Sequence, residues 1–177
     1  MAVPVPQLFS TSRAEAASVR FPPLFYPVVI VLALAVQAYL PVVIHSAVYL
    51  DLPLLAVVYW ACTVRQPVYA SALGAAVGLA QDSLAHLALG VNGIAKTLVG
   101  YAGAGIGARV DADHPGIRAI AVLVAVVFNR AVLYGFDRFL LGTPVPWRGA
   151  VTALAAGVNA LLALGLFRYL DRFRRWI

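Results

Sequence analysis

Five side chains that could take part in chemistry lie within or beside apolar stretches of this sequence: Asp82, Ser83, His86, Lys96 and Arg130. Asp82 and His86 are spaced to share one face of a helix, with Ser83 adjacent. A serine in such a setting could act as a nucleophile beside a general base. A catalytic triad requires a geometry that this spacing does not supply, so we interpret the residues as a helical Asp-His pair and expect no enzymatic activity.

The charged residues Asp82, Lys96 and Arg130 form a second candidate site, because charged groups inside apolar segments are costly. A short turn at residues 89–93 separates the segments that carry Asp82 and Lys96. An antiparallel hairpin of this kind brings the two side chains to similar depth, so we expect an ion pair between them that Arg130 can share. Two interpretations remain open, a structural pair that fixes helix assembly and a functional site such as a proton relay.

The sequence predicts no metal or cofactor site. Cys62 is the single cysteine, and one thiol makes neither a disulfide nor a thiolate metal site within the chain. His45 and His114 are expected in loops on opposite sides of a membrane, so they do not form a two-histidine site.

The composition is that of an integral membrane protein. Of the 177 residues, 63% are hydrophobic and 11% are charged, and mean hydropathy is +0.90, whereas soluble domains are about 25% charged. A transmembrane helix takes about 20 apolar residues, so the chain has room for about six. The formal charge of +6 is explained by arginines that set membrane topology, and we expect no nucleic-acid partner.

Apolar segments bounded by Pro, Gly or charged residues occupy residues 28–44, 52–64, 68–89, 91–108, 117–134 and 150–166. The second is the shortest, and Asp51 as N-cap with Pro53 in the first turn marks its start. If all cross the membrane with the N-terminus inside, the cytoplasmic arginines are Arg13, Arg20, Arg65, Arg109, Arg118, Arg168, Arg172, Arg174 and Arg175, and the external ones are Arg138 and Arg148. The positive-inside rule therefore predicts an all-α protein of six transmembrane helices with both termini cytoplasmic.

This topology divides the chain into three parts. Residues 1–20 form a cytoplasmic tail, residues 21–170 form the six-helix domain, and residues 171–177 form a basic tail. We expect the basic tail to lie along anionic lipids, and the alternative is that it docks on a cytoplasmic protein. Tyr59 and Trp60, near the inner end of the second segment, are expected at the membrane interface, where aromatic residues are enriched.

Small residues recur at every fourth position in the third and fourth segments. The two series are Ala70, Gly74, Gly78 and Asp82, and Lys96, Gly100, Ala104 and Ala108. Small residues at this spacing allow helix backbones to approach closely in lipid. The pattern predicts a tightly packed hairpin in the centre of the chain.

This central hairpin resembles that of the MreD family, the rod-shape-determining membrane proteins. The resemblance rests on the segments GAAVGLAQD at 74–82, LG at 89–90 and AKTLVGY at 95–101. Elsewhere it rests on size, span count and the Asp-Leu-Pro sequence at 51–53. The positions that match the family's pattern are Gly78, Asp82, Gly90, Lys96, Gly100 and Tyr101.

The resemblance implies a non-enzymatic scaffold of the bacterial inner membrane that binds MreC. Its wider partners would be the MreB filament, RodA and a penicillin-binding transpeptidase, which together build peptidoglycan during cell elongation. It also implies a fold similar to the S-components of energy-coupling-factor transporters. The alternative function is therefore a vitamin-binding S-component, which would carry an outward-facing pocket with several convergent polar or aromatic groups.

Overall fold

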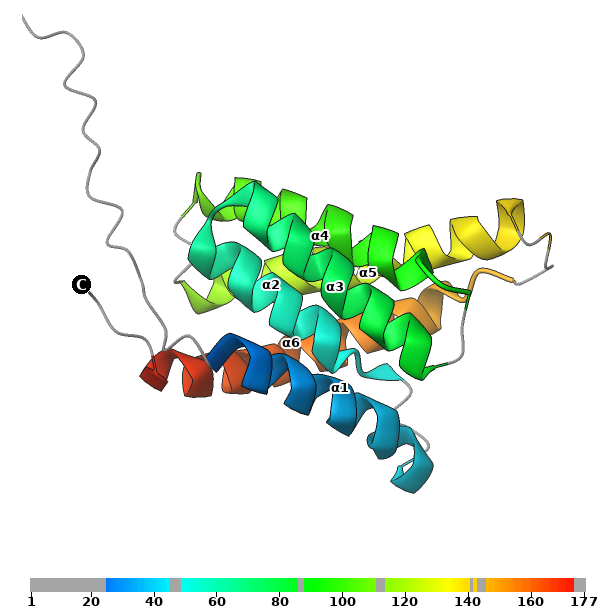
Figure 1. Cartoon of the computed structure of the whole chain (residues 1–177), viewed down its shortest axis with the longest axis horizontal. Coiled ribbons are helices and arrows are strands. Elements are labelled where there is room, and N and C mark those ends of the chain that lie inside the picture. Colours follow the sequence, from blue (N-terminus) through cyan, green and yellow to red (C-terminus); the bar gives the residue numbers. More distant parts are fainter. Residues whose placement is uncertain are drawn as a thin grey trace, which may run out of the picture.

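The computed structural model describes residues 25–44, 49–85, 88–110, 114–140, 142 and 146–173. Over these residues the chain is all-helical, as expected, with one helix for each apolar segment (Figure 1). The helices are α1 (Phe25–Val43), α2 (Leu52–Val64), α3 (Pro67–Leu84), α4 (Val91–Gly107), α5 (Pro115–Phe139) and α6 (Gly149–Leu170), and the 3-10 turn η2 (Asp171–Phe173) continues α6. Two of them, α5 and α6 with its continuation, are long and apolar enough to cross a membrane.

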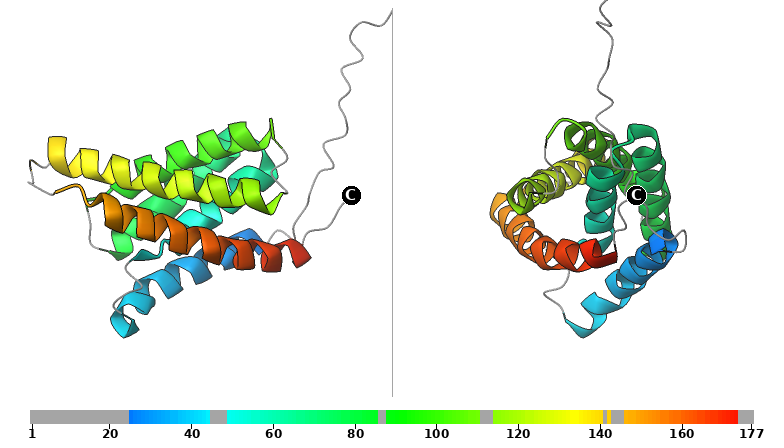
Figure 2. Two further views of the ribbon diagram at one scale, coloured as in Figure 1. Left: turned by 180° about the vertical axis from the view of Figure 1, so that it is seen from behind. Right: turned by 90° about the vertical axis from the view of Figure 1, so that its left-hand side faces the viewer.

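The short helix α2 is the core of the bundle. Its residues from Pro53 to Thr63 are all buried, and it contacts each of the other five α-helices. The end-on view in Figure 2 shows α2 enclosed by the rest of the bundle. Tyr59 and Trp60, which were expected at a membrane interface, are each only 1% exposed. They pack against aromatic rings inside the bundle.

The ends of α2 follow from its sequence. The Asp51 carboxylate accepts the Leu54 N–H at 3.0 Å, which satisfies one of the free donors of the first turn. Pro53 lies in that turn, where its missing N–H costs little. The helix ends where Arg65 adopts a left-handed conformation (φ 55°) and its N–H returns to the Ala61 carbonyl. These boundaries are the ones predicted.

Helices α3 and α4 form the closely packed hairpin that their small residues predict. A Cβ atom added to Gly78 would collide with the Asn92 carbonyl, and one added to Gly100 would collide with the Ala70 carbonyl. The backbones of the two helices therefore touch, and only glycine fits at these positions.

The turn of this hairpin differs from the sequence-based expectation. Helix α3 ends at Leu84 rather than Leu89, and α4 begins at Val91. Asn92 and Gly93 therefore lie in the first turn of α4 rather than in the connecting loop. Gly90 precedes the helix with φ +100°, a conformation that favours glycine.

The start of α1 and the end of α6 lie at the same end of the bundle (Figure 1), where the Phe25 and Phe173 rings are 5.4 Å apart. Asp171 in η2 accepts the Tyr59 hydroxyl at 3.0 Å and pairs with the buried Arg118 guanidinium at 2.5 Å. Residues 171–173, expected to begin the basic tail, thus pack onto the bundle. Residues 174–177 of that tail lie outside the described residues.

Candidate functional site

The Asp82 carboxylate is fully buried and bonds to the start of α4. Its oxygen Oδ2 accepts the backbone N–H groups of Gly90 at 2.9 Å, Asn92 at 3.1 Å and Gly93 at 3.4 Å. Oδ1 accepts the Asn92 side-chain amide at 2.8 Å. The free N–H groups and the positive end of the helix dipole stabilise a carboxylate at this place. Asp82 therefore caps α4 from the neighbouring helix, which explains why α4 starts early enough to include Asn92.

The Lys96 side chain is also fully buried, and its ion-pair partner is Asp51. The Lys96 Nζ atom lies 3.1 Å from Asp51 Oδ2 and donates to Asn92 Oδ1 at 3.3 Å. The expected direct pair between Lys96 and Asp82 is thus wrong: Asn92 stands between them, donating to Asp82 and accepting from Lys96. Asp82 is already satisfied by the donors of α4, so the ammonium group bonds to the second carboxylate.

Arg130 was expected to share the Asp82 carboxylate, but its neighbour Asn129 is the residue of α5 that reaches the buried charges. Arg130 is only partly buried, and among the described residues no hydrogen bond or ion pair joins it to Asp82 or Lys96. Asn129 is 3% exposed and directs its amide nitrogen to Asp51 Oδ2 at 3.5 Å. Adjacent residues of a helix do not share a face, so only one of the two can enter the bundle.

Two further amide side chains satisfy the non-helical backbone just before α2. Gln37 donates to the Leu50 carbonyl at 3.0 Å and accepts the N–H of the first α2 residue at 2.9 Å. Asn159, which is fully buried, accepts the Asp51 N–H at 3.0 Å and donates to the Tyr49 carbonyl at 2.8 Å. Unpaired backbone groups are costly away from water, so these contacts allow α2 to start inside the bundle.

Together these side chains form a buried polar junction to which every helix contributes. Its members are Gln37 of α1, Asp51 at the start of α2, Asp82 of α3, Asn92 and Lys96 of α4, Asn129 of α5 and Asn159 of α6. Of the two side chains in the ion pair, that of Lys96 has no exposure and that of Asp51 is 16% exposed. An arrangement this enclosed is suited to holding helices together, which favours the structural interpretation of the charges.

Sequence reasoning identified Asp82 and Lys96 but assigned Asp51 only as a helix cap. It gave no role to Gln37 or Asn159. A signal for both was present, since each is a polar residue in the middle of an otherwise apolar segment. Such residues face the interior of a helical bundle in lipid.

The remaining candidate residues have simpler roles or lie elsewhere. Ser83 is exposed and donates to the Leu79 carbonyl of its own helix, and His86 and His45 lie outside the described residues. Tyr101, the last position of the family pattern, is 62% exposed on α4. The part of the chain that the structure describes holds no group of three or more His, Cys, Asp or Glu side chains able to bind a metal.

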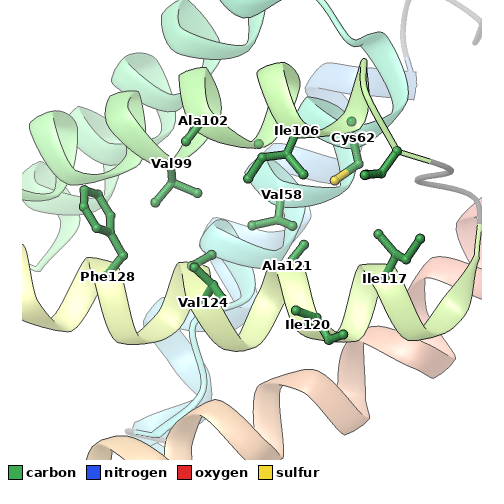
Figure 3. A pocket seen from close by; sticks show the side chains of 14 residues that line it. Val58, Cys62, Val99, Ala102, Ile106, Ile117, Ile120, Ala121, Val124 and Phe128 are labelled. Carbon is green, nitrogen blue, oxygen red and sulfur yellow. The ribbon is translucent and has the colours of Figure 1, made fainter.

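A separate pocket of about 360 Å³ lies between α2, α4 and α5 (Figure 3). Val99 and Ile106 of α4 face Val124 of α5 across it, with Val58 and Cys62 of α2 at its base. The lining is apolar throughout. A vitamin site requires several convergent polar groups, so this pocket does not favour the S-component alternative.

No protein-family model, curated protein or solved structure matches this chain.

The pairing of Lys96 predicts which double substitution restores stability. Lys96→Met leaves the Asp51 charge unpaired and should cost about 3 to 5 kcal/mol, whereas Asp51→Asn with Lys96→Met removes both charges and should recover much of the loss. Asn at position 51 keeps an oxygen to cap α2. Thermal unfolding of the purified variants in detergent measures the effect. Asp82→Asn combined with Lys96→Met is the matched control and should give no recovery; recovery there and none with Asp51→Asn would refute the assignment.

Proposed function

We propose that this chain is a non-enzymatic membrane scaffold of the MreD type, which binds MreC within the cell-elongation machinery of a bacterium. The observation that carries the proposal is that the positions matching the family's pattern make connected contacts in this structure. Gly78 and Gly100 make the α3–α4 backbone contact, and Asp82, Gly90 and Lys96 form its turn and its link to the polar junction. Five of the six positions in the pattern thus contribute to one connected part of the structure.

Placement in a membrane is supported by apolar side chains on the outside of the bundle and charged side chains within it. Large apolar side chains cover the outside of the bundle, among them Val31 at 64%, Ile120 at 61% and Leu161 at 71% exposed. Inside the bundle, charged and amide side chains lie beside the apolar core, and Asp82, Lys96 and Asn159 have no exposure. In soluble proteins, Lys, Asp and Asn side chains are mostly exposed. In lipid, polar groups have to find their partners inside the protein, as Asp82 and Lys96 do here.

The shortness of α2 is compatible with a six-span protein. Its 13 residues reach only about 20 Å at 1.5 Å per residue. Non-helical backbone is tolerated at membrane depth where protein surrounds it, and Gln37 and Asn159 bond to the segment before α2. Both ends of the described bundle lie together, which supports an even number of crossings. The arginine distribution then favours cytoplasmic termini in the bacterial inner membrane.

The partners follow from the proposed class. MreC would bind an outward face of the bundle, and Tyr101 is the family-pattern position that is exposed there. MreB, RodA and a penicillin-binding transpeptidase would belong to the same assembly. The basic C-terminal tail would lie along anionic lipids, where each arginine gains about 1 kcal/mol.

The topology can be tested by labelling single cysteines in intact cells on a Cys62→Ser background. Leu89 is 72% exposed beyond α3, and Val110 is 41% exposed beyond α4. A membrane-impermeant maleimide should modify Leu89→Cys and spare Val110→Cys, which becomes reactive once the cells are opened. Labelling of both from outside, or of Val110→Cys alone, would contradict the six-span arrangement.

The partner can be tested by purifying the tagged chain from its native membranes and identifying the proteins that accompany it. MreC should be recovered. Tyr101→Ala should lower its recovery, because an exposed aromatic ring is a frequent anchor of an interface. Leu161→Ala, on the exposed face of α6, is the control and should leave recovery unchanged. A well-folded preparation that contains a transporter ATPase in place of MreC would overturn the proposal in favour of the S-component class.

A further inference from the structure

We propose that the polar junction contains a binding site for a single water molecule, held between Lys96 of α4 and Asn129 of α5. Asn129 is 3% exposed, yet its Oδ1 atom has no hydrogen-bond donor among the described residues. Buried acceptors are paired in native proteins, and leaving one unpaired costs about 1 to 3 kcal/mol. The oxygen therefore requires a donor.

The orientation of the Asn129 amide is fixed by its neighbour. Its nitrogen points to Asp51 Oδ2 at 3.5 Å, and turning the amide over would place two acceptor oxygens against each other. The atom without a partner is thus the oxygen.

Lys96 supplies the other half of the site. An ammonium group has three N–H donors, and Lys96 uses two of them, on Asp51 at 3.1 Å and on Asn92 at 3.3 Å. The third N–H requires an acceptor, because Lys96 is fully buried. Lys96 Nζ and Asn129 Nδ2 both approach Asp51 Oδ2, so the two incomplete groups are neighbours around one oxygen.

The ligand must accept one hydrogen bond and donate another. A metal cation is disfavoured because the Lys96 ammonium lies beside the same carboxylate oxygen, and an anion is disfavoured by the Asp51 carboxylate. A neutral hydroxylic molecule meets both needs, and water is the smallest. Buried waters commonly make two to four such bonds. The partial exposure of the Asp51 side chain, at 16%, gives the site a side from which water can enter.

Lys96 is the chain's single lysine, so 15N-lysine labelling gives one side-chain ammonium signal. Solid-state NMR of the full chain in lipid bilayers, with magnetisation transferred from water to nitrogen, reports whether water contacts that group. The wild type should show rapid transfer, and Asn129→Leu should slow it several-fold. Thr97→Val is the matched control, since the Thr97 hydroxyl bonds only to the Gly93 carbonyl of its own helix, and should behave like wild type.

Two results would overturn the proposal. Absence of rapid transfer in the wild type would show that water does not contact Lys96. This measurement needs no variant. Unchanged transfer in a folded Asn129→Leu variant would show that Asn129 does not hold the water.

Discussion

The ion pair between Lys96 and Asp51 is the contact on which the rest of the bundle depends. A fully buried ammonium group cannot remain charged at low cost unless a carboxylate and further acceptors surround it. Asp51 meets this need only if α2 starts in the interior, with its carboxylate directed to α4. The chain before α2 must then be non-helical inside the bundle, and its backbone needs partners. Gln37 and Asn159 supply them, which ties α1 and α6 to the same place.

The hairpin of α3 and α4 brings Asp82 and Asn92 to the same junction. Its glycines bring the backbones into contact, and this closeness is what lets Asp82 reach the first N–H groups of α4. The capped start of α4 then holds Asn92, which bridges Asp82 and Lys96. The hairpin and the polar junction are therefore one continuous structure. In the proposed scaffold, it would keep the outer surface of the bundle in a fixed shape for a partner to recognise.

The sequence allowed the helices to be predicted but not the pairing of the charges. Apolar segments give helix positions directly, and the cap at Asp51 with Pro53 gave the limits of α2 correctly. The partner of Lys96 could not be found in this way, because Asp51 is 45 residues away and its proximity depends on how α2 packs against α4. The same limit applies to Asn129 and Arg130, since which neighbour faces inward depends on the rotation of α5. The burial of Tyr59 and Trp60 could not be predicted either, because a position near a helix end does not show that other helices cover a residue.

The most direct test of this account is the distance from the Lys96 side-chain nitrogen to the carboxyl carbons of the aspartates. Dipolar recoupling between 15N-lysine and 13C-aspartate in lipid bilayers measures it, and the single lysine removes any ambiguity on one side. If Lys96 pairs with Asp51, the coupling is strong, is lost in Asp51→Asn and is retained in Asp82→Asn. A coupling that survives Asp51→Asn and disappears in Asp82→Asn would contradict this pairing.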